Sequence, residues 1–150
     1  MRLWWLEGVE GDRPATVEDL AAVGVLYERH PEDAVQPALD RLRTERGYVT
    51  QDIVELRPDT PNLEGLLGKF KDEHLHRDDE VRFVLEGAGI FDIRGAGDRW
   101  IRVEVERGDL IVVPADLYHR FFLTEQRQIR CVRLFKDAAG WVPEYRAAAR

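Results

Sequence analysis

The chain has 150 residues, of which 44% are hydrophobic and 34% are charged, a balance typical of a folded globular domain and not of a disordered chain. A chain of this length corresponds to one domain, and it buries enough surface to fold without a disulfide or a metal ion. The 22 Lys and Arg residues and 29 Asp and Glu residues give a net charge of −7, and this acidic balance argues against nucleic acid as a partner.

The cysteine content and the apolar segments indicate the compartment. Cys131 is the only cysteine, so no intrachain disulfide can form. Its alternating apolar surroundings favour a small buried hydrophobic residue over the alternative, a reactive thiol. The apolar run at the N-terminus is broken by Glu7, too early for a secretory signal, and no segment approaches the ~20 apolar residues of a membrane span. We therefore expect a cytoplasmic protein without a membrane partner.

The first third of the chain has mainly helical patterns. Thr16, with the carboxylate of Asp19 three residues later, is typical of a capped helix start. Gly47 follows a stretch with apolar residues on one helical face, as a terminating glycine does. The predicted elements are a helix over residues 16–23, a helix over 32–46, a strand over 52–56 and one or two helical turns over 63–67.

From Lys69 onward the pattern changes to short β-rich segments. Residues 101–106 alternate strictly between apolar and charged side chains, as in a strand with one buried face. Gly87-Ala88-Gly89 and Gly95-Ala96-Gly97 lack the spacing of a phosphate-binding loop and are interpreted as hairpin turns. The predicted strands are 69–76, 80–85, 89–93, 100–106, 109–113, 119–124 and 129–135. Such closely spaced strands predict a sandwich or barrel, including the jelly-roll type.

Three histidines and one glutamate stand out in this β-rich part. His74 and His76 are two residues apart, so in a strand both imidazoles project from one face. Glu80 follows in phase if the chain bends slightly, and His119 begins a later predicted strand. Any one of these histidines alone is more commonly an ordinary surface or core residue. Together with the glutamate they can bind Fe, Ni, Mn, Co or Zn, and they leave two octahedral positions open for a substrate with two adjacent oxygens.

The flanking glycines and proline complete two motifs. Gly68, five residues, His-x-His, three residues, Glu80, six residues and Gly87 resemble the first motif of the cupin superfamily. Gly108, five residues, Pro114 and then the third histidine resemble the second motif. The resemblance implies a mainly β fold, a cupin-type double-stranded β-helix (jelly-roll) barrel with the N-terminal α-helices packed outside.

The same resemblance gives the domain organisation. We expect a single cupin domain over residues 1–150, with a helical N-terminal part over 1–68, a metal-binding barrel core over 69–136 and a C-terminal tail over 137–150. Asp116 stands where cupins usually have Gly, and Leu123 stands where they often have Asn. Asp tolerates left-handed backbone better than most residues, and the position of Leu123 is not that of a metal ligand, so we expect the site to be retained.

A longer stretch of sequence points to one family within the cupin superfamily. Residues 72–83 resemble the metal motif of the acireductone dioxygenase family, especially its eukaryotic-type branch. The segments that agree with that family in order are 24–27, 89–94, 100–102, 108–114, 118–121 and 133–135. The likeness therefore runs over nearly the whole chain, including its helical N-terminal part.

This resemblance implies an enzyme of methionine salvage that acts on the acireductone 1,2-dihydroxy-3-keto-5-methylthiopentene. With Fe(II) and O2 such enzymes give 4-methylthio-2-oxobutanoate and formate, and with Ni(II) they give 3-methylthiopropanoate, carbon monoxide and formate. Carried over residue by residue, the ligands of one ion per chain are His74, His76, Glu80 and His119. The sequence does not select Fe over Ni, because both ions accept these ligands.

The resemblance also assigns residues to the substrate pocket. Arg82 lies two residues past the ligand carboxylate and should point inward, where a buried arginine needs an anionic partner such as the substrate. Arg133 aligns with a second pocket arginine of the family, and Phe70, Phe121 and Trp141 align with its pocket aromatics. The alternatives are salt bridges that shape the barrel for the arginines and plain core packing for the aromatics.

Other interpretations of the chain stay open. Another cupin oxygenase would keep the four ligands without both pocket arginines. A non-catalytic cupin that binds a metal or small ligand would be expected to lose a ligand. Asp78 and Asp79 could either orient the ligand imidazoles or be solvated loop acids. A closed barrel with a polar exterior is compatible with a monomer, and the expected partners are the acireductone and O2.

Overall fold

The structure, a computed structural model, describes residues 1–6, 13–136 and 143–146. Its strands are β1 (Arg2–Trp5), β2 (Leu26–Arg29), β3 (Thr50–Leu56), β4 (His74–Leu75), β5 (Glu80–Arg94), β6 (Trp100–Glu106), β7 (Asp109–Val113), β8 (His119–Leu123), β9 (Ile129–Phe135) and β10 (Glu144–Tyr145). Its helices are α1 (Val17–Ala21), α2 (Val35–Arg46) and α3 (Leu63–Gly68), with 3-10 turns η1 (Glu32–Ala34) and η2 (Ala96–Asp98). None of these described helices is long and apolar enough to cross a membrane.

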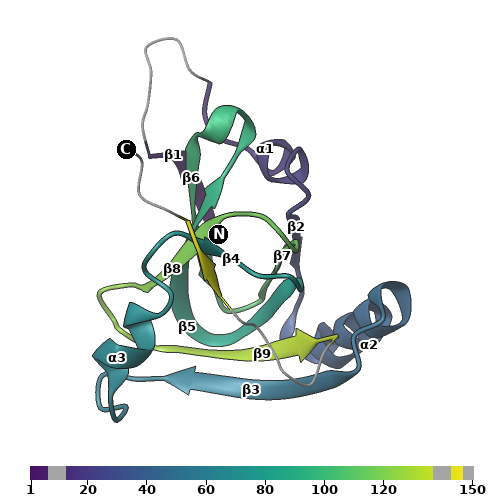
Figure 1. The fold of residues 1–150 in the computed structure, drawn as a ribbon. Helices are drawn as coiled ribbons and strands as arrows, with labels where there is room; N and C mark the ends of the chain where they lie inside the picture. The colour runs from purple at the N-terminus through teal and green to yellow at the C-terminus, as the bar shows by residue number, and fades with distance from the viewer. Residues whose placement is uncertain (7–12, 137–142, 147–150) are drawn as a thin grey trace.

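The long strand β5 organises the barrel. Its first half pairs with β7 and β9, and its second half pairs with β6 and β8, always antiparallel. Two sheets, β2-β7-β5-β9-β3 and β1-β6-β5-β8-β4-β10, therefore share one strand, and Figure 1 shows β5 curving beneath β4. In the described part of the chain this arrangement confirms the predicted mainly β barrel.

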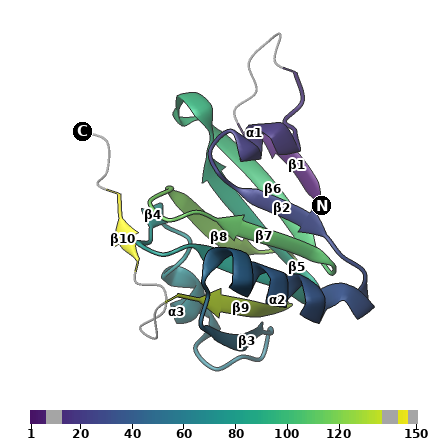
Figure 2. The same ribbon diagram turned by 90° about the vertical axis from the view of Figure 1, so that its right-hand side faces the viewer.

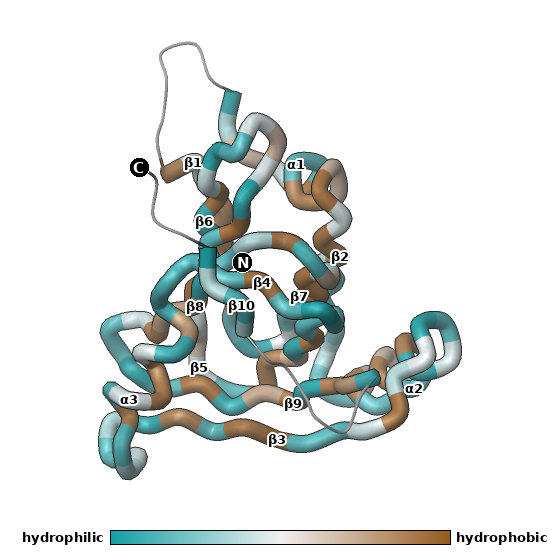
Figure 3. The backbone as a smooth tube through the Cα atoms, viewed as in Figure 1, coloured by the Kyte–Doolittle hydropathy of each residue, from teal (hydrophilic) through white to brown (hydrophobic). Residues whose placement is uncertain are grey.

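Alternation along the strands separates the inside of the barrel from its outside. Ile111 belongs to the interior core, whereas its strand neighbour Val112 packs in a second, outer cluster. Helix α2 lies over that outer face, as Figure 2 shows. Its Leu39 and Leu42 belong to the outer cluster, and each such buried side chain contributes roughly 1.5–3 kcal/mol. Figure 3 shows hydrophobic and hydrophilic residues alternating along the strands. The predicted packing of this N-terminal helix outside the barrel is confirmed.

The predicted hairpin at Gly87-Ala88-Gly89 is wrong, because these residues lie inside β5. The pairing with β9 shifts register between Val84 and Glu86, and the pairing with β8 begins at Gly89. Gly87 has a φ of +76°, and a Cβ there would lie 2.2 Å from the carbonyl oxygen of Gln128. The glycines therefore allow one strand to bend at a barrel corner. A Gly-Ala-Gly sequence is equally typical of a hairpin turn, so the sequence alone does not separate the two structures.

The described part of the first 68 residues contains three strands, more than the mainly helical prediction included. β1 pairs with β6, β2 pairs with β7, and β3 pairs with β9 over its full length. β1 and β2 have only four residues each, too few for periodicity to identify. The predicted strand over 69–76 is reduced to the two residues of β4, because a helical turn in which the Phe70 N–H donates to the Leu67 carbonyl occupies its start.

Asp19 stabilises the first turn of α1 in a pH-dependent way. Its carboxylate accepts the Thr16 N–H at 2.8 Å, and its hydrogen bonds with Arg13 lower its pKa to about 2. Asp19→Asn is expected to reduce the free energy of unfolding at pH 7 by about 1 kcal/mol. A lowered pKa stabilises the folded chain above the unfolded value, so the difference should shrink as the pH falls from about 4 toward 2. Urea unfolding at several pH values tests this, and a pH-independent difference would contradict it.

Candidate metal centre

Three buried histidines meet at one end of the barrel. His74 lies in β4 directly opposite His119 in β8, and His76 follows β4 by one residue. One ring nitrogen from each of the three lies within 4.8 Å of the others, and all three side chains are at most 2% exposed. The two-residue spacing thus places His74 and His76 close together, and the pairing of β4 with β8 brings His119 next to them.

Glu80 completes this cluster as the first residue of β5. Its Oε1 lies 3.7 Å from Nε2 of His76 and 3.8 Å from Nε2 of His119. The structure therefore brings together all four side chains that the sequence predicts as metal ligands. Three imidazoles and one carboxylate, facing one another and shielded from water, form a donor set that suits a borderline divalent ion.

Backbone carbonyls orient two of the rings. Nδ1 of His74 donates to the Asp72 carbonyl at 2.7 Å, and Nδ1 of His119 donates to the Leu117 carbonyl at 2.8 Å. Such bonds fix the tautomer in which Nε2 keeps its lone pair. Among the described residues, neither Nε2 atom has a hydrogen-bond partner. A buried acceptor nitrogen without a partner is costly, and a metal ion would satisfy both atoms.

The protonation states also fit metal binding. Burial lowers the pKa of His74, and burial lowers that of His76 to about 4, so both imidazoles are neutral at pH 7. Burial alone would raise the pKa of Glu80, but Arg82 and the neighbouring histidines outweigh it and hold this pKa well below its ordinary value. At neutral pH His74 and His76 therefore offer neutral imidazoles and Glu80 an ionised carboxylate, the forms that coordinate metals.

Arg82 extends from β5 beside these ligands, as predicted. It is 2% exposed, and its Nε lies 3.6 Å from Oε2 of Glu80. Its Cζ lies 4.8 Å from the ring centroid of Phe121, 5.9 Å from that of Phe91 and 6.0 Å from that of Phe70. Three aromatic rings and one carboxylate stabilise a guanidinium that would otherwise be costly to bury.

Comparison with known proteins assigns this centre to a family. The ARD/ARD' family model matches residues 8–143. The chain belongs to the ARD/ARD' family. It is 52% identical over 134 residues to the acireductone dioxygenase of Heterostelium pallidum, covering 89% of this chain and 92% of that protein. It is 42% identical over 140 residues to the acireductone dioxygenase of Rattus norvegicus, covering 91% of this chain and 78% of that protein.

A solved structure of the ARD/ARD' type agrees with the fold. Acireductone dioxygenase from Bacillus anthracis with a cadmium ion in its active center matches with a TM-score of 0.85 and 34% sequence identity, over 95% of this chain and 96% of that one. The match confirms the cupin-type barrel. A metal ion in that relative and three converging histidines here agree on metal binding.

The other residues that the ARD/ARD' resemblance assigns to the pocket occupy different surroundings. Arg133 pairs in register with Arg82, which places both on the same face, and its guanidinium donates to both carboxylate oxygens of Asp52 at 2.8 and 2.5 Å. Phe70 is half-buried, and its ring packs edge-on against Phe121 at 6.5 Å. Trp141 lies outside the described residues. Contact of these side chains with a substrate stays a prediction.

The second motif tolerates its departures from the usual cupin pattern. Asp116 has a φ of 66°, the left-handed conformation expected for a position where Gly is usual. Its side chain accepts a hydrogen bond from Arg77 at 2.8 Å, and its N–H donates to the His76 carbonyl at 2.8 Å. Leu123 ends β8 opposite Gly89, away from the four ligands. The turn into the His119 strand is therefore retained.

Cys131 is buried next to Arg82, which confirms the prediction of a small buried residue. It is 0% exposed, burial raises the pKa of its thiol, and Sγ lies 3.6 Å from NH1 of Arg82. A protonated, buried thiol reacts slowly. We expect no reaction with an aromatic disulfide reagent in the folded protein and one thiol per chain in denaturant. Modification of the folded protein at the rate of a free thiol would contradict this assignment.

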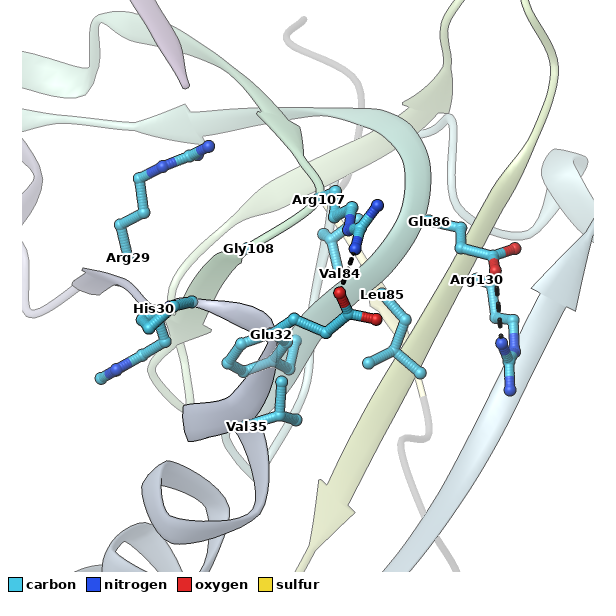
Figure 4. A pocket seen from close by; sticks show the side chains of 12 residues that line it. Arg29, His30, Glu32, Val35, Val84, Leu85, Glu86, Arg107, Gly108 and Arg130 are labelled. Atoms are coloured by element: carbon cyan, nitrogen blue, oxygen red, sulfur yellow. Dashed lines mark hydrogen bonds and ion pairs between the residues drawn. The ribbon is translucent and has the colours of Figure 1, made fainter.

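A separate cavity of about 780 Å³ lies on the outer side of β5, beside residues 83–86 of that strand. Figure 4 shows Arg107 paired with Glu32, and Arg130 paired with Glu86, at its edge. His30 is half-buried here and stacks on Phe83 with ring centroids 6.0 Å apart. None of the four candidate ligands lines this cavity, so it is distinct from the metal centre.

Proposed function

We propose that this chain is a metal-dependent acireductone dioxygenase of methionine salvage. It cleaves 1,2-dihydroxy-3-keto-5-methylthiopentene with O2, to 4-methylthio-2-oxobutanoate and formate when it holds Fe(II), and to 3-methylthiopropanoate, carbon monoxide and formate when it holds Ni(II). The observation that carries the proposal is the buried cluster of three imidazoles and one carboxylate beside a buried arginine. Relatives named acireductone dioxygenase at up to 52% identity support it.

One Fe(II) or Ni(II) ion per chain is proposed as the cofactor. His74, His76, Glu80 and His119 would hold it, because the three imidazoles converge and the Glu80 carboxylate lies beside two of them. In addition, two imidazole Nε2 atoms lack a hydrogen-bond partner among the described residues. When bound, the ion supplies a Lewis acid and a template for two substrate oxygens.

The protein's own side chains bind and orient the substrate. The acireductone is an enediol that becomes anionic when it loses protons, and Arg82 offers a buried positive charge fixed next to Glu80. An arginine already desolvated and held by aromatic rings needs no reorganisation to receive an anion. Phe70 and Phe121 beside it exclude water and suit the apolar methylthio end of the substrate. Arg133 and Trp141 complete the proposed pocket.

The proposal includes a cytoplasmic monomer whose reactants are the acireductone and O2, with neither nucleic acid nor membrane as a partner. An acidic surface, with a net charge of −7, supports the exclusion of nucleic acid. A single buried cysteine suits a reducing compartment.

The activity is tested directly with reloaded protein. Protein stripped of metal is loaded with Fe(II) without oxygen and mixed with enzymatically generated acireductone; O2 is then admitted. The expected result is stoichiometric oxygen uptake with release of formate and the methylthio keto acid, far above spontaneous oxidation. The matched control is the same protein left free of metal. Metal-loaded protein that does not exceed this control would overturn the proposed activity.

A further inference from the structure

Asp79, the residue before Glu80, contacts a loop far along the chain. Its Oδ1 accepts the N–H of Ala115 at 2.9 Å, and its Oδ2 accepts the hydroxyl of Tyr48 at 2.7 Å. Lys136 Nζ and Arg46 NH1 lie 3.6 and 3.8 Å from the same Oδ2. Its side chain is 13% exposed, and its partners are a backbone N–H, a tyrosine hydroxyl and two cationic side chains, so this carboxylate is neither a solvated loop acid nor an acceptor for a ligand imidazole.

The contact with Ala115 lies where the barrel's own hydrogen bonds end. The pairing of β5 with β7 stops at Glu80 opposite Val113, and β4 pairs with β8 through a single residue pair. Between these points the chain turns through residues 114–118 and enters β8 with His119. Three contacts join this turn to the loop that carries His76: the Ala115 N–H to Asp79 carboxylate bond, the Asp116 N–H to His76 carbonyl bond and the Arg77–Asp116 pair.

We propose that Asp79 is a positioning residue of the metal centre: its carboxylate fixes the turn that leads to His119 against the loop between His76 and Glu80. The inference rests on the proposal that these side chains, with His74, bind a metal ion. His74, His76 and Glu80 lie in or next to the loop on one side of this contact, and His119 follows the turn on the other side. Loss of the contact frees this fourth ligand to move relative to the other three, so metal affinity falls although every ligand is present.

A matched control exists at the opposite end of β7. Asp109 is also buried, and it accepts a tyrosine hydroxyl, from Tyr27 at 2.5 Å, and a backbone N–H, from Glu106 at 2.9 Å. It also pairs with Arg29 at 2.9 Å. The two carboxylates thus have the same kinds of partner, but Asp109 contacts no ligand loop. Asp109→Ala reports the general cost of losing such a residue.

The test uses Co(II) alone as the probe. Metal-free wild-type protein and its Asp79→Ala, Asp79→Asn and Asp109→Ala variants are titrated with Co(II) by calorimetry, and the visible spectrum of bound Co(II) reports its coordination. Asp79→Ala is expected to weaken binding by about 10- to 100-fold and to change the spectrum. Asp79→Asn keeps an oxygen for the Ala115 N–H, so it should stay within about threefold of wild type, as should Asp109→Ala.

Each other outcome is decisive. Equal Co(II) affinity and spectrum in Asp79→Ala and wild type would overturn the positioning role, as would an equal loss in Asp109→Ala or in Asp79→Asn. If Asp79→Ala does not fold, Asp79→Leu replaces it with the same expectations, because leucine keeps the branched shape and loses only the oxygens. Wild-type protein that binds no Co(II) would instead contradict the proposed metal centre itself.

Discussion

Replacing His74 with alanine is expected to abolish tight metal binding while the barrel stays folded. A four-ligand metal site is worth ~10–16 kcal/mol, or roughly 2.5–4 kcal/mol per ligand, so affinity should fall by about 10²- to 10³-fold. The interior core and the outer core under α2 do not include this residue, which is why the fold should survive. Metal content after dialysis and a thermal melt followed by circular dichroism measure both effects.

The control for this variant is His30→Ala, which removes a histidine that hydrogen-bonds to Glu28 and lies outside the metal centre. It should bind one ion per chain, as wild type does. A His74→Ala protein that retains stoichiometric metal would show that the cluster is not the binding site. Complete unfolding of that variant, or of metal-free wild type, would show that stability and metal binding are not separable.

Arg82→Met is expected to retain the metal ion and to lose most turnover. Methionine fills much of the space of the arginine and removes its charge, so the pocket loses the fixed cation that receives the anionic substrate. The loss of one such group costs ~10²–10³-fold in rate, and we expect kcat/KM to fall by that factor while Co(II) affinity changes less than about tenfold. Steady-state oxygen uptake by the Fe(II)-loaded variant, corrected for its metal content, is the measurement.

Arg102→Met provides the comparison, because Arg102 also pairs with a buried carboxylate, Asp92, at 2.7 Å, and neither of these two residues is a candidate metal ligand. Its kcat/KM should remain near wild type. Full activity in Arg82→Met would assign Arg82 a structural role only. A proportional loss of metal and activity would mean that the arginine acts through Glu80 and not on the substrate.

The ligand set was predictable because its spacing is local. His74 and His76 share a strand face whatever the rest of the chain does, and Glu80 follows at a fixed distance along the backbone. His119 was placed by the flanking glycine and proline pattern, and pairing of β4 with β8 then brings it opposite His74. The barrel strands β6, β7 and β9 were predicted with their observed bounds, because each is a short β-rich segment, and residues 101–106 of β6 also alternate strictly.

Contacts that depend on a register shift or on distant loops were not predictable. Phe91 contacts the guanidinium of Arg82, yet the two residues lie an odd number of positions apart, which in a regular strand places them on opposite faces. The bulge between Val84 and Glu86 inserts the residue that restores a common face. Asp79 gave no signal of its partner either, because Ala115 lies in a different turn and donates a backbone N–H that every non-proline residue has.

We propose that His74, His76, Glu80 and His119 jointly bind one metal ion. Crystals of Ni(II)-loaded protein, measured on both sides of the nickel absorption edge, test it most directly. We expect one anomalous difference peak per chain, ~2.0–2.2 Å from a ring nitrogen of each histidine and from a carboxylate oxygen of the glutamate. A peak elsewhere on the protein, or none at these four side chains, would contradict the account.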